Sequence, residues 1–393
     1  MSEDSGRTMA LTATPPESSA AGPEPAPGRS VGTGAPGAPR RPRRGGRAVL
    51  VAAIVIALLV APLYVDAFWL NLGGFAFAAS IGAIGLTILY GRVGQLSLAH
   101  SFFLAVGAYG YLFFASPAVE GSWGMGLPPL LAVGAAVVLS AVVGLAFSPL
   151  SRRLKGISIG VATLALIFIG EHVLYAFPEL SGGFNGRSVP DLTIGGFAVI
   201  GNEPAITLLG VPFGRPERLW VVAGLTLLAT ALLASRILRG RVGRAYIAVR
   251  DSEQHAAALG IDVNRTRSSG FMVSAVLAGL SGVLLALAFR RIVPEYWSLM
   301  LSLQYLAMVI IGGLGSIRGA VGGAAFVTAL PLLLQRYGEA VPGLSSDPGA
   351  PFPPSVVAQL VFGLLIVVVL MRDPRGIAHQ LTQLRARWRA RSR

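Results

Sequence analysis

The sequence predicts an all-α, polytopic membrane protein, and three observations support this fold class. Of the 393 residues, 53% are hydrophobic and only 13% are charged, with a mean hydropathy of +0.67. Soluble domains carry about a quarter charged residues. Several apolar runs approach or exceed the roughly 20 residues that a helix needs to cross a bilayer. The chain also has no cysteine, which excludes disulfides and thiolate metal sites.

Hydropathy predicts about ten transmembrane helices over residues 48–371, and the short or glycine-interrupted ones are expected to be broken or re-entrant. The predicted segments are 48–66, 68–90, 98–116, 127–147, 157–177, 218–235, 269–289, 299–314, 319–336 and 355–371.

The net charge of +14 does not indicate nucleic-acid binding, because most of it lies in the tails and in short loops between apolar runs. Lys and Arg are enriched in cytoplasmic loops, so this distribution predicts cytoplasmic N- and C-termini. Arg290 and Arg291 fit poorly, since the same topology places them outside. The predicted cytoplasmic segments are 1–47, 91–97, 148–156, 236–268, 315–318 and 372–393.

Three non-spanning regions flank or interrupt the helices. Residues 1–47 are rich in Pro, Gly, Ala and Ser and end in an arginine cluster, which predicts a disordered basic tail before a start anchor. A signal peptide is the alternative for this basic-then-apolar pattern. Residues 372–393 form a basic cytoplasmic tail, and the outer loop 178–217 is too short for a globular domain.

An unusually polar stretch, GRVGQLSLAHSFFLAVGAYG, occupies Gly91 to Gly110. Non-helical backbone and polar groups at membrane depth must be buried in protein or line a wet cavity. Gln95, Ser97, His100 and Ser101 are therefore candidate residues of a solute path, since they offer both donors and acceptors. The alternative for His100 is an ordinary packed residue. The topology places Gly91 near the cytoplasmic side, which favours an inner mouth or gate.

A second interrupted segment runs from Gly312 to Ser316 and is preceded by Gln304. Glycine breaks in both halves of a chain are typical of transporters that bind solutes near the midplane. We therefore include Gln304, Gly312 and Gly313 in the candidate path. Gly319 and Gly323 have the GxxxG spacing, which favours close helix packing.

The cytoplasmic loop 236–268 contains a predicted short amphipathic helix between Val242 and Leu259. Asp251 or Ser252 is expected to cap a second helical segment, with Gly260 as its C-terminal stop. A solvated basic loop is the simpler interpretation of the same pattern.

Catalytic motifs are missing from the sequence. It contains no phosphate-binding G-x-x-x-x-G-K-[ST] loop, metal cluster, nucleophile elbow or paired-carboxylate site, so no catalytic or metal-binding residue is predicted. Glu171, near the outer end of the fifth predicted helix, is either a functional intramembrane carboxylate or an interfacial residue that reaches water.

Four motifs resemble those of one family, in the same order and spacing over about residues 70–370. GQLSLAHSFFLAVGAYGYL, SGGFNG, DSEQHAAALGIDVNRTRSSGFMVSAVLAGLSGVLLA and VIIGGLGSIRGAVGGAAF are similar to segments of the permeases of branched-chain amino acid ABC importers. More broadly, they resemble the related permeases for urea and short amides.

The resemblance implies a multi-pass subunit of the plasma (inner) membrane that binds no cofactor itself. Its partners would be a second homologous permease subunit, two cytoplasmic ATPase subunits that carry ATP and Mg, and an extracytoplasmic solute-binding protein. The solute would be a branched-chain amino acid, with urea, amides and other small acids left open. Ion-coupled secondary transport through Glu171 and a passive channel are the alternatives.

The resemblance also assigns roles to individual residues. Gly182, Gly183 and Asn185 of SGGFNG join the solute path on this ground. The loop 236–268 becomes a coupling helix that seats on the ATPase subunit. His255, Ala257 and Gln304 depart from the family pattern. The coupling residues carried over are Glu253, Ala256, Ala258, Leu259 and Gly260.

Overall fold

A computed structural model describes residues 44–154, 157–195, 197–201, 206–208, 211–337 and 353–372. Most of the predicted tail 1–47 and of the tail 372–393 lies outside the described residues. The chain divides into two units, Met1–Leu50 and Val51–Arg393, and the helices that position the candidate site belong to the second.

Helices coincide with all ten predicted segments. Six of them are long and apolar enough to cross a membrane and four are shorter apolar helices, so how many cross stays a prediction. They are α1 (Arg44–Val60), α2 (Ala67–Ile88), α3 (His100–Ala115), α4 (Pro129–Arg153), α5 (Ile157–Ala176), α7 (Arg215–Arg239), α10 (Val263–Phe289), α11 (Leu299–Gly312), α12 (Ile317–Tyr337) and α13 (Pro354–Arg372).

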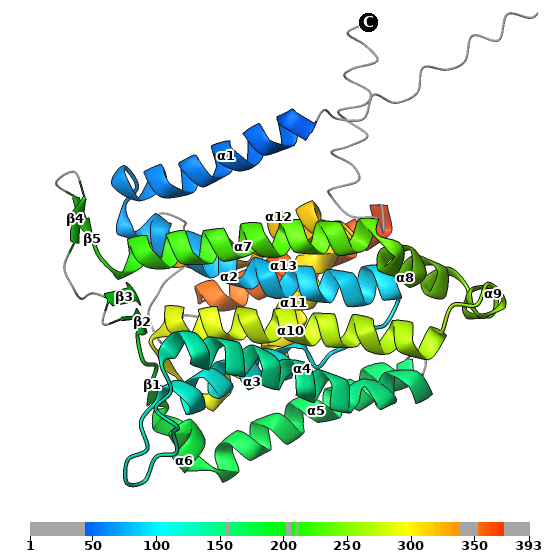
Figure 1. Ribbon diagram of the computed structural model, residues 1–393, viewed down its shortest axis with the longest axis horizontal. Helices are drawn as coiled ribbons and strands as arrows, with labels where there is room; N and C mark the ends of the chain where they lie inside the picture. The colour runs from blue at the N-terminus through cyan, green and yellow to red at the C-terminus, as the bar shows by residue number, and fades with distance from the viewer. Residues whose placement is uncertain are drawn as a thin grey trace, which may run out of the picture. The chain divides into compact units, whose positions relative to one another are not determined.

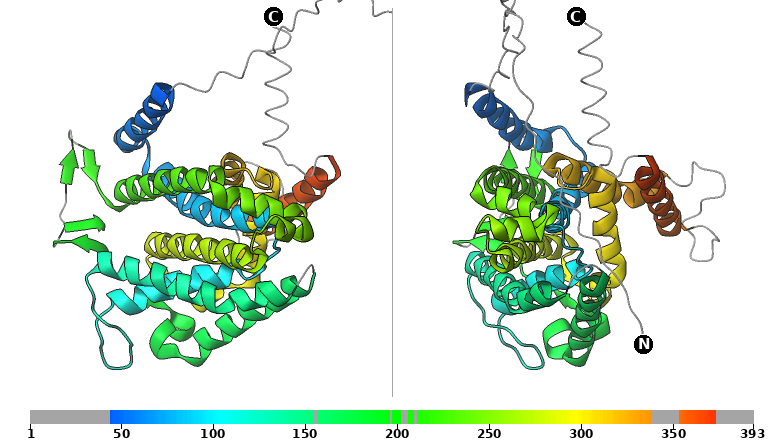
Figure 2. Two further views of the ribbon diagram at one scale, coloured as in Figure 1. Left: turned by 45° about the vertical axis from the view of Figure 1, so that its right-hand side comes forward. Right: turned by 90° about the vertical axis from the view of Figure 1, so that its right-hand side faces the viewer.

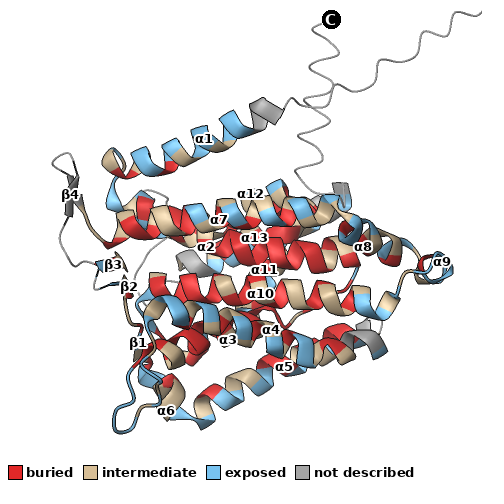
Figure 3. Ribbon diagram, viewed as in Figure 1, coloured by how far each residue is buried: buried red, intermediate tan, exposed pale blue. Residues whose placement is uncertain are grey.

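Helices α2 and α10 form the centre of the described helices (Figures 1 and 3). In the most apolar stretches of the α2 segment and of α10, 83% and 72% of the residues are buried. In the corresponding stretches of α4 and α7, only 22% and 28% of the residues are buried. A helix that is hydrophobic all round belongs in a core or in lipid. Helices α4 and α7 leave large apolar side chains exposed, as expected of helices that contact lipid or another subunit.

Small residues let the central helices approach closely. A Cβ atom added to Gly107 of α3 would lie 2.1 Å from the carbonyl oxygen of Gly279 in α10. One added to Gly282 would lie 2.0 Å from the carbonyl oxygen of Leu104. Membrane helices associate largely by such packing, because lipid provides no hydrophobic drive between them.

The loops gather at two opposite ends of the helices (Figure 1). One, here called the α8 end, holds α8 (Arg241–Asp251), α9 (Glu253–Ala258) and the last turn of the α2 segment, Leu89–Val93. The turn at Gly315 lies there too, since Gly315 contacts Gly91. The predicted cytoplasmic segments 91–97, 236–268 and 315–318 therefore lie together. The opposite end is here called the strand end, and a second view repeats this separation (Figure 2).

The strand end carries short β-structure that the sequence did not predict. Residues 178–217 contain α6 (Pro178–Ser181), a 3-10 turn at Gly183–Asn185 and five short strands, β1 to β5; four of these pair with each other, and β1 pairs with β6 beyond this range. Otherwise the described residues are predominantly helical, consistent with the predicted all-α class. The pairs are β1 (Arg187–Ser188) with β6 (Arg291–Ile292), β2 (Leu192–Ile194) with β3 (Phe197–Ile200), and β4 (Ile206–Leu208) with β5 (Val211–Phe213).

The predicted amphipathic segment forms two helices, α8 and α9, with the boundary at Ser252. The Ser252 side chain accepts from the His255 N–H at 3.3 Å, so Ser252 rather than Asp251 is the cap. Gly260 ends the segment with φ +77°. Its N–H bonds the Ala257 carbonyl, and the next N–H bonds the Ala256 carbonyl. The predicted glycine stop is thus confirmed.

Candidate functional site

The polar stretch is a break between α2 and α3 that lies inside the protein. The α2 segment ends in a π-helical turn, Leu89–Val93, and Gly94 adopts the left-handed conformation with φ +80°. Residues 95–99 are non-helical, and α3 begins only at His100. Gln95 and Ser97 are each only 5% exposed, so this irregular backbone is shielded by protein, as membrane depth requires.

The start of α3 lies beside the middle of α2. A Cβ atom on Gly82, midway along the 27-residue segment Ala67–Val93, would lie 3.2 Å from His100 Nε2. The break therefore runs back from the α8 end to the centre of the helices. With 16 residues, α3 spans about 24 Å, less than the roughly 30 Å hydrocarbon core. The stretch thus extends from the α8 end to the middle of α2, and its role as an inner mouth or gate stays a prediction.

At this centre, α3 meets the first turns of α11. The Ser101 N–H donates to Ser302 Oγ at 2.9 Å, and the two hydroxyl oxygens are 2.9 Å apart. The ring of His100 packs against that of Tyr305, with centroids 4.8 Å apart. Helix α10 adds Ser281, whose hydroxyl lies 3.1 Å from the Tyr305 hydroxyl. Helices α2, α3, α10 and α11 thus meet at one polar cluster, and Gly82 of α2 packs against it. The polar cluster consists of His100, Ser101, Ser281, Ser302 and Tyr305.

Sequence reasoning missed Ser302, Tyr305 and Ser281. Ser302 and Tyr305 are three residues apart and therefore share one face of α11. This pair of polar residues on one face of a mainly apolar helix was the available signal. Gln304, which was predicted, lies about 100° around the helix from Tyr305 and is only half-buried.

The polar cluster is closed in this conformation. Ser101 and Ser302 are 0% and 2% exposed, and His100 is 3% exposed. Protein atoms therefore shield these side chains from solvent in this conformation. The cluster offers hydroxyl donors and acceptors, an imidazole, and the N-terminal turns of two short helices, whose dipoles favour anionic groups.

The second predicted break is also present. Helix α11 ends at Gly312, Gly313 has φ +106°, and Gly315 has φ +77°. Gly323 lies against α11, since a Cβ there would be 2.0 Å from the Met308 carbonyl oxygen. The predicted close packing of the GxxxG pair is thus confirmed at Gly323.

The two breaks touch each other at the α8 end. A Cβ on Gly91 would lie 2.2 Å from the Gly315 backbone nitrogen. The Arg92 Nε–H donates to the Gly315 carbonyl at 2.9 Å. The Arg250 Nη1–H, from α8, donates to the Gly91 carbonyl at 2.9 Å.

The remaining predicted path residues lie at the strand end. Gly182 and Gly183 both adopt positive φ, and Asn185 is exposed in the turn that follows. The Arg187 guanidinium donates to the carbonyls of Glu179 and Leu180 just before this turn at 3.1 and 3.2 Å, and burial lowers the pKa of Arg187. The predicted path residues therefore occupy three levels and do not form one site.

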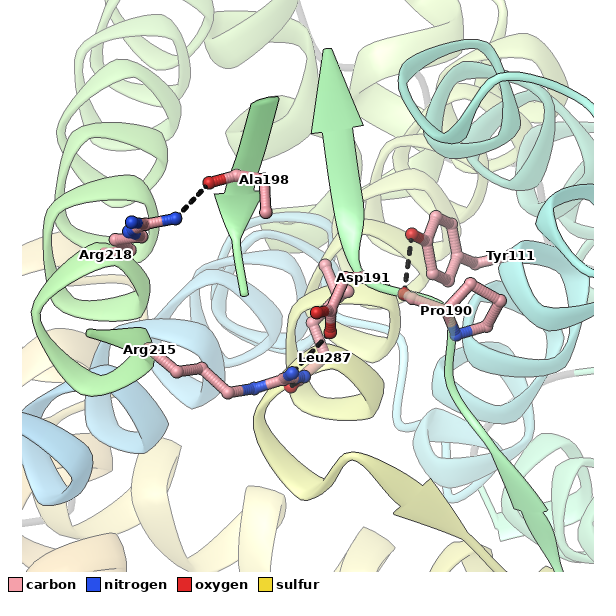
Figure 4. A network of polar contacts seen from close by, with 7 residues as sticks. All are labelled: Tyr111, Pro190, Asp191, Ala198, Arg215, Arg218 and Leu287. Atoms are coloured by element: carbon pink, nitrogen blue, oxygen red, sulfur yellow. Dashed lines mark hydrogen bonds and ion pairs between the residues drawn. The ribbon is translucent and has the colours of Figure 1, made fainter. Parts of the chain in front are cut away.

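A polar network that the sequence did not predict anchors the strand end (Figure 4). Arg215, in the first turn of α7, pairs with Asp191 just before β2 and donates to the Leu287 carbonyl at the end of α10 at 2.7 Å. Arg218 donates to the Ala198 carbonyl in β3 at 2.6 Å. The signal in the sequence was two arginines three residues apart at a helix start, which places them on one face.

The loop of α8 and α9 is secured by its own contacts. Glu253 pairs with Arg267 of α10, and Ala256 is 1% exposed, so both serve the packing of α9 in this conformation. Tyr246 anchors α8, its hydroxyl lying 3.2 Å from Ser269 Oγ, and burial raises the pKa of Tyr246. The other three predicted coupling residues, Ala258, Leu259 and Gly260, are exposed.

Comparison with known proteins decides the family. Residues 68–370 match the family described as branched-chain amino acid transport system / permease component. The chain belongs to this family. No solved structure matches it.

Curated relatives of this permease family cover most of the chain. The LivM permease protein of the Salmonella typhimurium high-affinity branched-chain amino acid transport system is 27% identical over 84% of this chain and 74% of its own length. LivH of Escherichia coli is 28% identical over 75% of this chain and 89% of its own length. BraD of Pseudomonas aeruginosa is 29% identical with the same coverage.

Proposed function

We propose that this chain is the membrane-spanning permease subunit of a binding-protein-dependent ABC importer. The observation that carries the proposal is the family match over residues 68–370, which includes both glycine-broken segments and the loop of α8 and α9. A permease subunit moves solute while ATP and Mg bind to partner chains, so this chain is not itself an enzyme.

The proposed solute is a branched-chain amino acid, as the names of LivM, LivH and BraD indicate for those proteins. A zwitterionic amino acid needs donors for its carboxylate and acceptors for its ammonium group. The first turns of α3 and α11 favour a carboxylate, and the hydroxyls of Ser101 and Ser302 accept as well as donate. Opening between α3 and α11 would present these groups to the solute.

The proposed partners dock at opposite ends. Two cytoplasmic ATPase subunits would be shared between this chain and a second homologous permease subunit, and α9 would seat on one of them. Leu259, at the end of α9, is 78% exposed and is therefore accessible to a partner. The binding protein would meet the strand end. This arrangement places the α8 end and both termini in the cytoplasm, with the chain in the plasma (inner) membrane.

The test is copurification and reconstitution. Tagged chain is coexpressed with an ABC ATPase, a second permease of this family and a solute-binding protein from the same genome, extracted in mild detergent and placed in liposomes. We expect an ATPase to copurify, and leucine uptake to require ATP and the binding protein and to be blocked by vanadate. Uptake that survives vanadate but stops with an uncoupler would instead identify an ion-coupled carrier, with Glu171 as the first carboxylate to test.

A further inference from the structure

Two arginines link the predicted docking loop to both glycine breaks. Helix α2 ends at Leu89–Val93, where the carbonyls of the last turn lack partners in a continuing helix. Arg250 of α8 donates to one of them, the Gly91 carbonyl. Arg92, one residue further, donates to the Gly315 carbonyl in the turn after α11. The chain of contacts thus runs from α8 to the end of α2 and on to the end of α11.

The contacts are direct and close. Gly91 approaches Gly315 so closely that a single methyl group there would collide with backbone. Gly94 is similarly close to Arg250, whose Cγ would lie 2.7 Å from an added Cβ. Asp251 orients the Arg250 guanidinium by accepting from its Nε and Nη2 at 3.0 and 2.9 Å. Movement of α8 must therefore displace the end of α2 or break these bonds.

Basic side chains often satisfy the last carbonyls of a helix, and this simple capping explains one such bond. Two features go beyond capping. The Arg250 donor comes from a loop 159 residues away along the chain, and Arg92 joins two helix ends that are 223 residues apart. The end of the α2 segment leads along the chain into α3, which carries His100 and Ser101. The other end belongs to α11, which carries Ser302 and Tyr305.

We propose that Arg250 and Arg92 are positioning residues that pass movement of the α8–α9 loop to the ends of α2 and α11, and so control separation of α3 from α11. This inference rests on the proposed function. Arginine suits the role because its rigid planar fork lets Arg250 bond a carbonyl and a carboxylate at once, which a lysine ammonium does less specifically.

The experiment uses the full complex in liposomes with Arg250→Gln and Arg92→Gln. The matched control is Arg265→Gln, since Arg265 is 90% exposed and its ion-pair partner is Asp262 at 3.9 Å. We expect both variants to assemble and to keep basal ATPase activity. Stimulation of ATPase by the loaded binding protein, and leucine uptake per ATP, should fall about tenfold, whereas the control should match the parent.

A second readout separates coupling from folding. The chain has no cysteine, so Ser302→Cys provides a single thiol in the polar cluster. In the complex that carries Ser302→Cys alone, the rate at which this thiol reacts with a small thiol reagent should change when ATP is added. In the complex that also carries Arg250→Gln, ATP should leave this rate unchanged. Unaltered uptake per ATP in both Gln variants would overturn the inference. Arg250→Lys is a second variant at this position, and failure of the complex to assemble with both Arg250→Gln and Arg250→Lys would overturn the inference as well. If the parent complex itself lacks ATP-dependent uptake, the proposed function fails instead.

Discussion

The N–H of Ser101 donates to Ser302 Oγ across 201 positions of sequence, at a distance of 2.9 Å. This bond joins the first turn of α3 to the first turns of α11 at the centre of the protein. Both helices are shorter than a full membrane crossing, and both side chains are buried. The contact closes the place where these two short helices meet.

Ser302→Ala should destabilise the protein and loosen this closure. The change leaves the Ser101 N–H without its acceptor in a buried setting, which costs about 1–3 kcal/mol. Thermal unfolding in detergent measures the loss. Ser80→Ala is the matched control, because the buried Ser80 hydroxyl bonds its own helix at the Ala76 carbonyl. Equal melting temperatures for the two variants would contradict the assigned role.

Gly91→Ala should separate the two glycine breaks. The new Cβ would lie 2.2 Å from the Gly315 nitrogen, and overpacking of this kind costs about 1–3 kcal/mol. We expect reduced yield of folded protein and strongly reduced leucine uptake. Gly134→Ala in α4 is the control, since its Cβ meets no protein atom within 4 Å and alanine favours helix. Parent-like uptake by Gly91→Ala would argue against close contact of the breaks.

Arg215→Gln should loosen the packing of residues 178–217 at the strand end. The change removes the partner of Asp191 and the donor to the Leu287 carbonyl. Because Asp191 is 41% exposed, solvent lowers the cost, and we expect about 1–3 kcal/mol, mostly from the buried carbonyl. Residues 178–217 should become faster to cleave with protease added to the strand end of reconstituted protein. Arg291→Gln, at an exposed arginine of β6, should leave the cleavage rate unchanged.

Leu259→Glu should weaken capture of the ATPase while the membrane fold stays intact. The side chain is 78% exposed, so its loss leaves no cavity, but docking against the ATPase would have to desolvate a carboxylate. We expect at least a tenfold loss of copurified ATPase with unchanged melting of the permease. Met125→Glu, exposed at the strand end, is the control. If both variants retain the ATPase equally, Leu259 is outside the docking surface.

Local signals along the chain predicted much of the candidate site. Left-handed glycines at Gly94 and Gly260, and the breaks they cause, follow from short-range backbone chemistry. The contact of Glu253 shows what local signals leave out. Its carboxylate pairs with Arg267, which packing of α9 against α10 brings within reach. The partner of Arg215 is likewise not a local property, because only the fold brings Asp191, just before β2, to the first turn of α7.

The sequence by itself determined the membrane class, the ten apolar helical segments, the two glycine breaks and the family, because hydropathy, glycine and motif order are local properties of the chain. Only the tertiary structure decided that Ser302, Tyr305 and Ser281 complete the cluster around His100 and Ser101. It also decided that Arg250 reaches Gly91. These contacts depend on how apolar helices rotate and cross as they pack, and nearly uniform hydrophobicity leaves that rotation unspecified in the sequence pattern.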